Sequence, residues 1–446
     1  MRPVFLDSFR PLRRRRRWLL YALVAALVVG SGGAAAAYLA FVKAPGNVSH
    51  PSVEFTTPSG GPKAKKAETF KWPFYGYTAA RTRYLDTKLD PPFYGTWQYK
   101  SGSLIEFQPI IANGTLYVVQ NNGKAAAIDA KTGEVKWRVR VGTLAASSPA
   151  FSKGRLYITT LSGRVTCLDA KTGKRHWKHN LPSRSESSPV VIDGIVYFGS
   201  EDGTVYAMRA GDGGIVWRYH APGAVKAALA YRDGILYFGD YSGTVTALHA
   251  SNGSRLWSTD TSGRAFQQSG RFYSTPAVAY GRVYLGNTDG FVYSFGAHSG
   301  QLAWRYQTGA YVYSAPAIGP GPGGRPTVFI GSYDSHFYAF DARSGSVLWR
   351  YAAAGRISGA PTVIGRVVYF SDLDSRGTSG LDVRTGRRLF KRHTGKFNPM
   401  ISDGKRMYMT GFSTIYAMVP RSLLSERKEI ARKPNRRSVP SPAAPR

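Results

Sequence analysis

The sequence contains a single cysteine, Cys167, among its 446 residues. One cysteine forms no intramolecular disulfide and supplies no thiolate cluster for a metal ion. Its place in the strand-like stretch VTCLDA predicts a small buried apolar residue. Disulfide-stabilised folds and cysteine-ligated zinc modules are therefore excluded.

Motifs that carry common chemistries are also lacking. The chain has no glycine-rich phosphate loop, no nucleophile elbow and no zinc-ligand spacing. His176 and His179 lie three residues apart on one expected strand, so their side chains point to opposite faces and do not form a metal pair. The sequence requires no metal ion, and we predict no catalytic residue.

Acidic residues are scarce, with 26 Asp and Glu against 60 Lys and Arg, and the formal net charge is +34. The two ends of the chain carry part of this excess, but about +19 remains on the middle. A basic body favours an acidic partner, such as an anionic envelope polymer or phospholipid headgroups, and solubility alone explains the charge equally well. We do not expect nucleic acid as the partner.

Only one long apolar run without charge is present, at residues 18–42, and it follows five consecutive arginines, Arg13 to Arg17. A helix of this length extends about 37 Å, enough to cross a hydrocarbon core of about 30 Å. We predict a basic cytoplasmic tail at 1–17 and a transmembrane anchor at 18–42, with the remainder extracytoplasmic by the positive-inside rule. A cleaved signal peptide, which would give a secreted protein, is the alternative.

Two further segments have no hydrophobic periodicity. Residues 43–70 mix Pro, Gly, Ser, Thr and Lys, and residues 421–446 are basic and rich in Pro. Compositions of this kind are typical of flexible linkers and disordered tails. We therefore expect the folded domain to span residues 71–420.

Within that domain an aromatic residue recurs about every 40 residues. The series is Trp97, Trp137, Trp177, Trp217, Trp257, Trp304, Trp349 and Phe390. A glycine lies four residues before each member from Trp137 onward, and turns rich in Gly, Asp and Asn divide each period into four strand-like runs. The pattern predicts an all-β fold of four-stranded antiparallel blades, a β-propeller.

The ends of the repeat give the number of blades. Seven periods close on the aromatic residues from Trp137 to Phe390, and three strand-like runs follow without a fourth. The run FYGTWQYK around Trp97 has no blade of its own. Pairing it with the last three runs closes the ring at eight blades and leaves no open sheet edge.

The turn segments AKTGEVKW (130–137), AKTGKRHW (170–177), ASNGSRLW (250–257) and ARSGSVLW (342–349) resemble the repeat of quinoprotein alcohol dehydrogenase-like propellers. That family includes dehydrogenases that use pyrroloquinoline quinone (PQQ) and non-enzymatic members like outer-membrane assembly factor B. The resemblance implies that each tryptophan of the series docks against the neighbouring blade, with Phe390 departing from the pattern. For the dehydrogenases it also implies a calcium ion, an aspartate base, an arginine near the quinone and, in many, adjacent cysteines, which this chain lacks. We therefore expect neither PQQ nor calcium.

When the repeats are aligned on the proline that opens each innermost strand, the residue three positions earlier varies from blade to blade. We expect the residues at this position to surround one mouth of the channel. Together with residues two places upstream, this position gives the candidate binding set: Glu106, Arg184, Glu186, Lys226, Arg271, Tyr273, Tyr311, Tyr313, Arg356 and Lys396. The following position is mostly small, with Phe107 and Phe397 as exceptions. Mixed charges and tyrosines suit a polar or anionic ligand or a peptide segment, and an ordinary solvated rim gives the same pattern.

These features predict a membrane-anchored, non-catalytic scaffold of the cell envelope that binds an envelope protein or anionic polymer. Two alternatives remain open. The chain could bind or cleave a cell-wall polysaccharide, or it could be a PQQ-dependent dehydrogenase.

Overall fold

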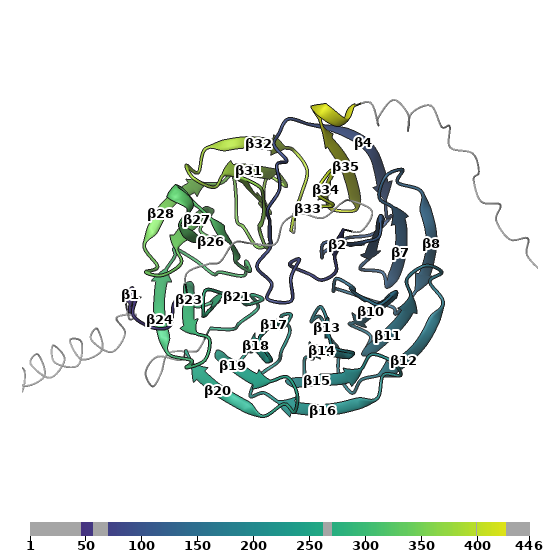
Figure 1. Ribbon diagram of the computed structural model, residues 1–446, viewed down its shortest axis with the longest axis horizontal. Helices are drawn as coiled ribbons and strands as arrows, with labels where there is room; N and C mark the ends of the chain where they lie inside the picture. Colours follow the sequence, from purple (N-terminus) through teal and green to yellow (C-terminus); the bar gives the residue numbers. More distant parts are fainter. Residues whose placement is uncertain (1–45, 57–69, 262–269, 398, 425–446) are drawn as a thin grey trace, which may run out of the picture. The chain divides into compact units, whose positions relative to one another are not determined.

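The computed structural model describes residues 46–56, 70–261, 270–397 and 399–424. Eight four-stranded antiparallel blades form a ring, so the predicted eight-bladed propeller is confirmed (Figure 1). The predicted cytoplasmic tail and transmembrane anchor at 1–42 lie outside the described residues. In the ranges that the structure describes, no helix has the length and apolar character needed to cross a membrane.

Each blade from the first to the seventh uses four consecutive strands, innermost first. Blade 1 has β5 (Ile110–Ala112), β6 (Thr115–Val119), β7 (Lys124–Asp129) and β8 (Val135–Arg140). Blade 2 has β9 (Ala150–Ser152), β10 (Arg155–Thr160), β11 (Arg164–Asp169) and β12 (Arg175–Asn180). Blade 3 has β13 (Val190–Ile192), β14 (Ile195–Gly199), β15 (Thr204–Arg209) and β16 (Ile215–His220). Blade 4 has β17 (Ala230–Arg232), β18 (Ile235–Gly239), β19 (Thr244–His249) and β20 (Arg255–Asp260).

Blade 5 has β21 (Ala277–Ala279), β22 (Arg282–Gly286), β23 (Phe291–Gly296) and β24 (Leu302–Gln307). Blade 6 has β25 (Ala317–Pro320), β26 (Pro326–Gly331), β27 (His336–Asp341) and β28 (Val347–Ala352), with the short 3-10 helix η1 (Pro322–Gly324) between β25 and β26. Blade 7 has β29 (Thr362–Ile364), β30 (Val367–Ser371), β31 (Thr378–Asp382) and β32 (Arg388–Arg392).

Blade 8 closes the ring with strands from the two ends of the domain. Its first three strands are β33 (Met400–Ser402), β34 (Met407–Thr410) and β35 (Thr414–Pro420), and the helix η2 (Arg421–Leu423) follows. The fourth strand is β4 (Phe93–Lys100), which pairs antiparallel with β35 and places Trp97 opposite Ala417. The predicted closure by the strand around Trp97 is therefore confirmed.

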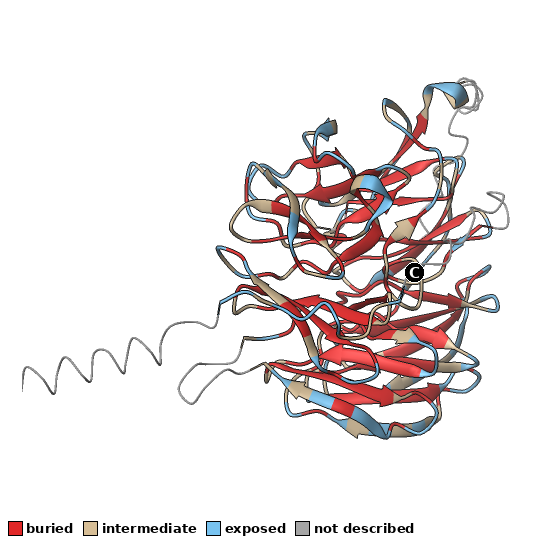
Figure 2. Ribbon diagram, turned by 60° about the vertical axis from the view of Figure 1, so that its left-hand side comes forward, coloured by how far each residue is buried: buried red, intermediate tan, exposed pale blue. Residues whose placement is uncertain are grey.

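Burial follows the position of a strand within its blade. The second and third strands are almost wholly buried because both of their faces pack on neighbouring blades, whereas the outer strands β8 and β16 alternate half-buried and exposed residues (Figure 2). Cys167 lies on the third strand of blade 2 and is fully buried, as predicted. Burial raises the pKa of its thiol to about 11, so the thiol is uncharged at neutral pH.

The tryptophans join each blade to the next. All seven predicted docking tryptophans donate from Nε1 to a backbone carbonyl of the following blade, over 2.8 to 3.3 Å. The ring of each also covers the turn glycine of that blade. For example, Gly345 has φ +75°, and a Cβ placed on it would lie 2.6 Å from the ring of Trp304. The turn thus needs glycine both for its backbone angle and for the approach of the indole.

Phe390 departs from the series because blade 8 lacks the partner that a tryptophan would need. The third and fourth strands of blade 8, β35 and β4, come from opposite ends of the domain, so no hairpin with a turn glycine joins them. Phe390 instead packs edge-on against Phe93 at the start of β4, with ring centroids 6.1 Å apart.

The expected flexible linker at 43–70 is wrong for residues 46–56. The strand β1 (Val48–Ser49) pairs with β24 on the outer edge of blade 5. The guanidinium of Arg282, which is fully buried, donates to the Val53 and Glu54 carbonyls, and the Glu54 carboxylate accepts the backbone N–H groups of His298 and Ser299. The Ser49 hydroxyl also donates to the Ser344 carbonyl, and Arg343 donates to the Pro51 carbonyl, so hydrogen bonds fix the segment to blades 5 and 6.

Residues 70–92, here called the plug, run through the centre of the ring. The strand β2 (Lys71–Trp72) pairs with β5 of blade 1, and β3 (Tyr84–Leu85) pairs in parallel with β29 of blade 7 (Figure 1). Between them, plug carbonyls accept backbone N–H groups from the inner strands of four more blades, at Phe151, Tyr231, Val278 and Ile318. Each of these bonds lies five residues beyond the predicted mouth position of its blade, so the plug crosses the channel deeper than the mouth.

Arg81 fixes the plug to blades 3 and 4. Its guanidinium is fully buried and donates to the Leu229 carbonyl at 2.8 Å, to the Ser188 carbonyl at 3.1 Å, and to the Tyr75 carbonyl within the plug. Burial, together with the neighbouring guanidinium of Arg83, lowers the pKa of Arg81 to about 9. The charge is retained at neutral pH and is stabilised there by backbone carbonyls.

Candidate functional site

A pocket opens at the mouth of the channel, at the end where every inner strand begins. Its volume is about 240 Å³, and its walls come from six of the eight blades. Tyr75 of the plug contributes to the lining. The other lining residues are Glu106, Phe107, Lys226, Ala227, Ala228, Tyr273, Thr275, Tyr313, Ala315, Tyr333, Ser358, Gly359, Ala360 and Phe397.

The deepest apolar part of the pocket lies against the plug. Tyr75 is buried and packs with Ala228, Ala315 and Ala360, and its ring meets that of Phe107 edge-on at 5.3 Å. The guanidinium of Arg83 lies 4.5 Å from the centre of the Tyr75 ring. This cation–π contact holds the ring in place, so the plug gives the pocket an aromatic contact surface.

A charged cluster forms one wall. Lys226 Nζ lies 3.0 Å from a Glu186 carboxylate oxygen and 3.1 Å from one of Glu201, and Arg184 pairs with Glu201 at 3.1 Å. The Tyr273 hydroxyl donates to the other Glu186 oxygen at 2.9 Å. Burial lowers the pKa of Lys226, but the bonds to both glutamates outweigh it and raise that pKa. The members of the cluster are therefore held by hydrogen bonds and ion pairs to one another.

Glu106 of the loop before β5 also lines the pocket. Burial and the nearby charge of Glu186 raise the pKa of the Glu106 carboxyl, and Lys396 partly offsets the increase. The pair Glu106 and Glu186 thus repel each other across the mouth. A partner that donates to Glu106 would stabilise its ionised form.

Aromatic side chains form the wall at blades 5 and 6. The Tyr313 ring packs against the rings of Tyr333, Tyr311 and Tyr273, with centroids 4.9 to 6.0 Å apart. Tyr311 is largely exposed at the outer rim. Tyrosines in such a cluster offer apolar rings and hydroxyl groups together, which is the composition of many protein-binding surfaces.

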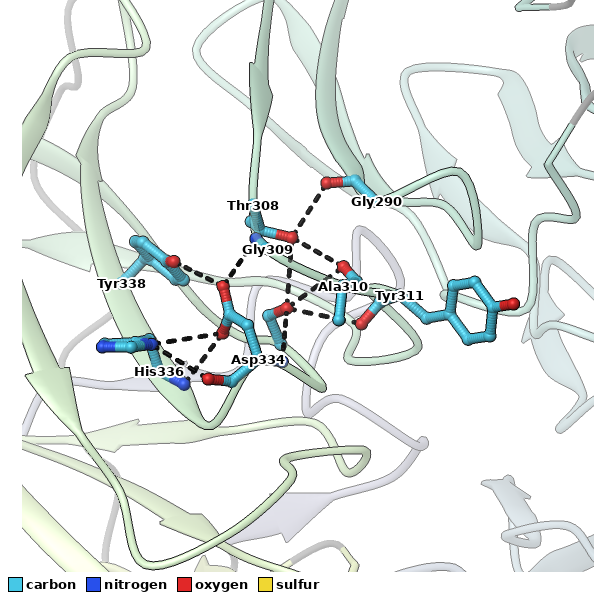
Figure 3. A network of polar contacts seen from close by, with 9 residues as sticks. Gly290, Thr308, Gly309, Ala310, Tyr311, Asp334, His336 and Tyr338 are labelled. Atoms are coloured by element: carbon cyan, nitrogen blue, oxygen red, sulfur yellow. Dashed lines mark hydrogen bonds and ion pairs between the residues drawn. The ribbon is translucent and has the colours of Figure 1, made fainter. Parts of the chain in front are cut away.

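A polar network holds the loop that carries Tyr311 and Tyr313 (Figure 3). One oxygen of the Asp334 carboxylate accepts the Gly309 N–H at 2.8 Å and the Tyr338 hydroxyl at 2.6 Å. The Thr308 hydroxyl donates to the Gly290 carbonyl of blade 5. The loop between blades 5 and 6 is therefore bonded to both of them, and this positions the tyrosines.

Three further predicted residues lie at the rim and do not line the pocket. Arg356 forms a paired contact with the Asp374 carboxylate, with a shortest distance of 2.7 Å. Arg271 lies 5.6 Å from the ring centre of Tyr241, and Lys396 lies over the rings of Phe397 and Phe412. These cations are held against local acidic or aromatic partners.

The structure brings the predicted mouth set together, but only four of its members line the pocket: Glu106, Lys226, Tyr273 and Tyr313. Sequence reasoning missed Tyr75, Tyr333, Phe107 and Phe397. A signal for the two phenylalanines existed, because they interrupt a ring of otherwise small residues. Tyr75 lies in a segment without any repeat, and no sequence pattern placed it in the channel.

The repeated part of the chain matches a known protein family. The sequence model of one family, described as outer membrane protein assembly factor BamB, matches residues 95–148, 142–269, 222–319 and 313–422, which together cover most of the chain. No curated protein matches the sequence.

Several solved structures share the fold. BamB from Moraxella catarrhalis is 18% identical, with a TM-score of 0.60, over 74% of this chain and 100% of that one. A europium-containing methanol dehydrogenase is 15% identical, with a TM-score of 0.66, over 80% and 98%. A quinohemoprotein alcohol dehydrogenase from Comamonas testosteroni is 16% identical, with a TM-score of 0.63, over 79% and 81%. Likeness at this level shows the fold alone.

The donor set of the pocket does not fit a calcium-bound quinone. Calcium takes six to eight oxygen ligands, with carboxylates prominent among them. The lining supplies one carboxylate, Glu106, and both oxygens of nearby Glu186 are bonded to Lys226 and Tyr273. Within the ranges described, no group of three His, Cys, Asp or Glu side chains is arranged to hold a metal ion.

Proposed function

The chain belongs to the family described as outer membrane protein assembly factor BamB, and from this premise we propose that it is a non-catalytic binding module of the cell envelope. In this proposal the apolar run at 18–42 anchors it to the membrane, the propeller is extracytoplasmic, and the mouth pocket receives a segment of a partner protein. Neither PQQ nor calcium takes part.

The observation that carries the proposal is the pocket itself. At about 240 Å³ it is smaller than the roughly 300–1,000 Å³ typical of small-molecule sites. Its rigid aromatic walls and the fixed Tyr75 resemble the pockets that receive one or two anchoring side chains in protein interfaces. The donor set, which does not suit a calcium-bound quinone, supports the non-catalytic part.

Filling the pocket is expected to abolish partner capture without changing any charge. Ser358→Trp places an indole in the lining, where Ser358 lies beside Gly359 and Ala360. We expect at least a tenfold loss of partner recovery when the full chain is crosslinked and purified from native membranes. The measurement is quantitative mass spectrometry of the crosslinked material.

The matched control is Ser251→Trp, which places an indole on an exposed turn of blade 4 at the opposite end of the channel and likewise changes no charge. It should capture the partner as well as the unaltered chain does, and thermal melting should show that both variants are folded. Equal recovery from the Ser358→Trp variant and the unaltered chain would contradict the proposal.

A further inference from the structure

Exposed cations are distributed very unevenly around the propeller. Over the outer strand and the turn that precedes it, blades 7, 8, 1 and 2 carry thirteen exposed Lys and Arg residues, and blades 3 to 6 carry four. The thirteen are Arg384, Arg387, Arg388, Lys391, Lys100, Lys131, Lys136, Arg138, Arg140, Lys171, Lys174, Arg175 and Lys178. We call this surface the basic sector.

The four blades of the basic sector are contiguous. Blade 7 meets blade 8 through Phe390 and Phe93, blade 8 meets blade 1 through Trp97 and Ala130, and blade 1 meets blade 2 through Trp137. Their outer strands β32, β4, β8 and β12 follow one another along one half of the ring (Figure 1). The thirteen cations therefore lie along one half of the ring's outer side, with Lys100 as the one member on blade 8.

Little negative charge offsets the basic sector. Glu134 is the one exposed acidic residue in these outer strands and turns. Lys136 pairs with the half-buried Asp129 at 3.2 Å. Neighbouring cations within the sector thus add their positive potentials most strongly at low salt, where screening is weak.

Protection of free sheet edges does not explain the asymmetry. Charged side chains on an edge strand discourage pairing with other chains, and this accounts for Arg218 on β16 and Arg255 on β20. Blades 3 and 4 have outer strands of the same kind, yet each carries a single exposed cation over the same stretch. The excess on blades 7, 1 and 2 therefore calls for another cause.

We propose that the basic sector binds an acidic polysaccharide. A flat bilayer would touch only a narrow strip of a convex surface that extends over half the ring, whereas a flexible polyanionic chain follows the curve and contacts all four blades. Single-stranded nucleic acid favours exposed aromatic platforms, and the large exposed apolar residues of the outer strands are Val216, Leu256 and Val347, all outside the sector.

This site is separate from the mouth pocket. The segment at 46–56 docks on the outer edge of blade 5, which lies outside the basic sector and whose outer strand has no exposed cation. The polymer would bind along the outer strands while the mouth remains accessible. The two interactions can therefore be tested independently.

The test uses full-length protein in detergent and alginate, a carboxylated polysaccharide, as the probe. Changing Lys171, Lys174, Arg175 and Lys178 to Gln together should weaken alginate binding at least tenfold in a sedimentation or calorimetric assay. Changing Arg218, Arg255, Arg343 and Arg350 to Gln removes the same charge from the other half of the ring. This control should weaken binding less than twofold, and affinity for the unaltered chain should fall as salt is raised.

Equal weakening in both quadruple variants would overturn the proposal, because it would show a diffuse response to net charge. Binding to vesicles of phosphatidylglycerol and phosphatidylcholine with none to alginate would also overturn it. The Ser358→Trp variant should bind alginate normally. That result separates failure of the basic sector from failure of the mouth pocket.

Discussion

Replacing Arg81 by Met is expected to lower the free energy of unfolding by about 4 kcal/mol, because each buried carbonyl left without a donor costs about 1–3 kcal/mol. Arg81 is fully buried and donates to carbonyls of blade 3, blade 4 and the plug itself. Methionine fills similar space and donates no hydrogen bond. Urea denaturation of the purified chain measures the change.

The control for this substitution is Arg366→Met. Arg366 also joins the plug to a blade, through ion pairs with Asp90 at 2.9 Å and Asp382 at 3.2 Å, but its side chain is half exposed. Exposed ion pairs contribute roughly 0–1 kcal/mol, so this variant should remain close to the unaltered chain. If both variants were equally stable, the buried guanidinium would not be what fixes the plug.

Alanine at Gly345 is expected to destabilise the propeller by about 3 kcal/mol, which combines the left-handed backbone angle with overpacking against Trp304. The glycine has φ +75°, and a Cβ on it would lie 2.6 Å from the indole. Trp304 is fully buried and bonded to Ala342, so its ring cannot move aside without breaking that contact.

Gly154 isolates the first effect, the backbone angle. It has nearly the same angle, φ +76°, and nothing lies within 4 Å of a Cβ placed there. The variant Gly154→Ala should therefore cost only about 1 kcal/mol for the backbone angle. Matched urea melts test the pair, and equal losses would show that the docking of tryptophan onto glycine adds nothing to the junction.

The repeat made the ring predictable from sequence. Its period, the tryptophan series and the unpaired strand around Trp97 specify eight blades, because each blade buries its faces on the next and needs the same residues at the same places. Even the exception at Phe390 follows from connectivity, since the blade that it faces has no turn glycine.

The parts that were not predictable are those that follow no repeat. Residues 46–56 and the plug bond to strand edges through backbone groups, and backbone bonding leaves little trace in side-chain patterns. Arg282 and Arg81 are buried by contacts with carbonyls more than a hundred residues away in sequence, so composition marked them as surface residues. Residues 46–56 were therefore read as linker, and the plug was given no place in the channel.

The sequence predicted the position of the mouth, but not all of the residues that line the pocket. The residues that vary between the aligned repeats include Glu106, Lys226, Tyr273 and Tyr313, which line the pocket. They vary because blade packing does not constrain them. It also selected rim residues such as Arg356, whose guanidinium is occupied by Asp374. The cavity depends on the plug and on Tyr333 from a neighbouring hairpin, and only the three-dimensional structure brings these together with the mouth.

The claim that the mouth pocket receives a partner is tested most directly by photocrosslinking in intact cells. A benzophenone amino acid at Tyr313 lies in the pocket lining, and one at Val216 lies on the exposed outer strand of blade 3. We predict a defined protein adduct from position 313 that disappears in the Ser358→Trp background, and none from position 216. An adduct from position 216 with none from position 313 would contradict the account and place recognition on the side of the propeller.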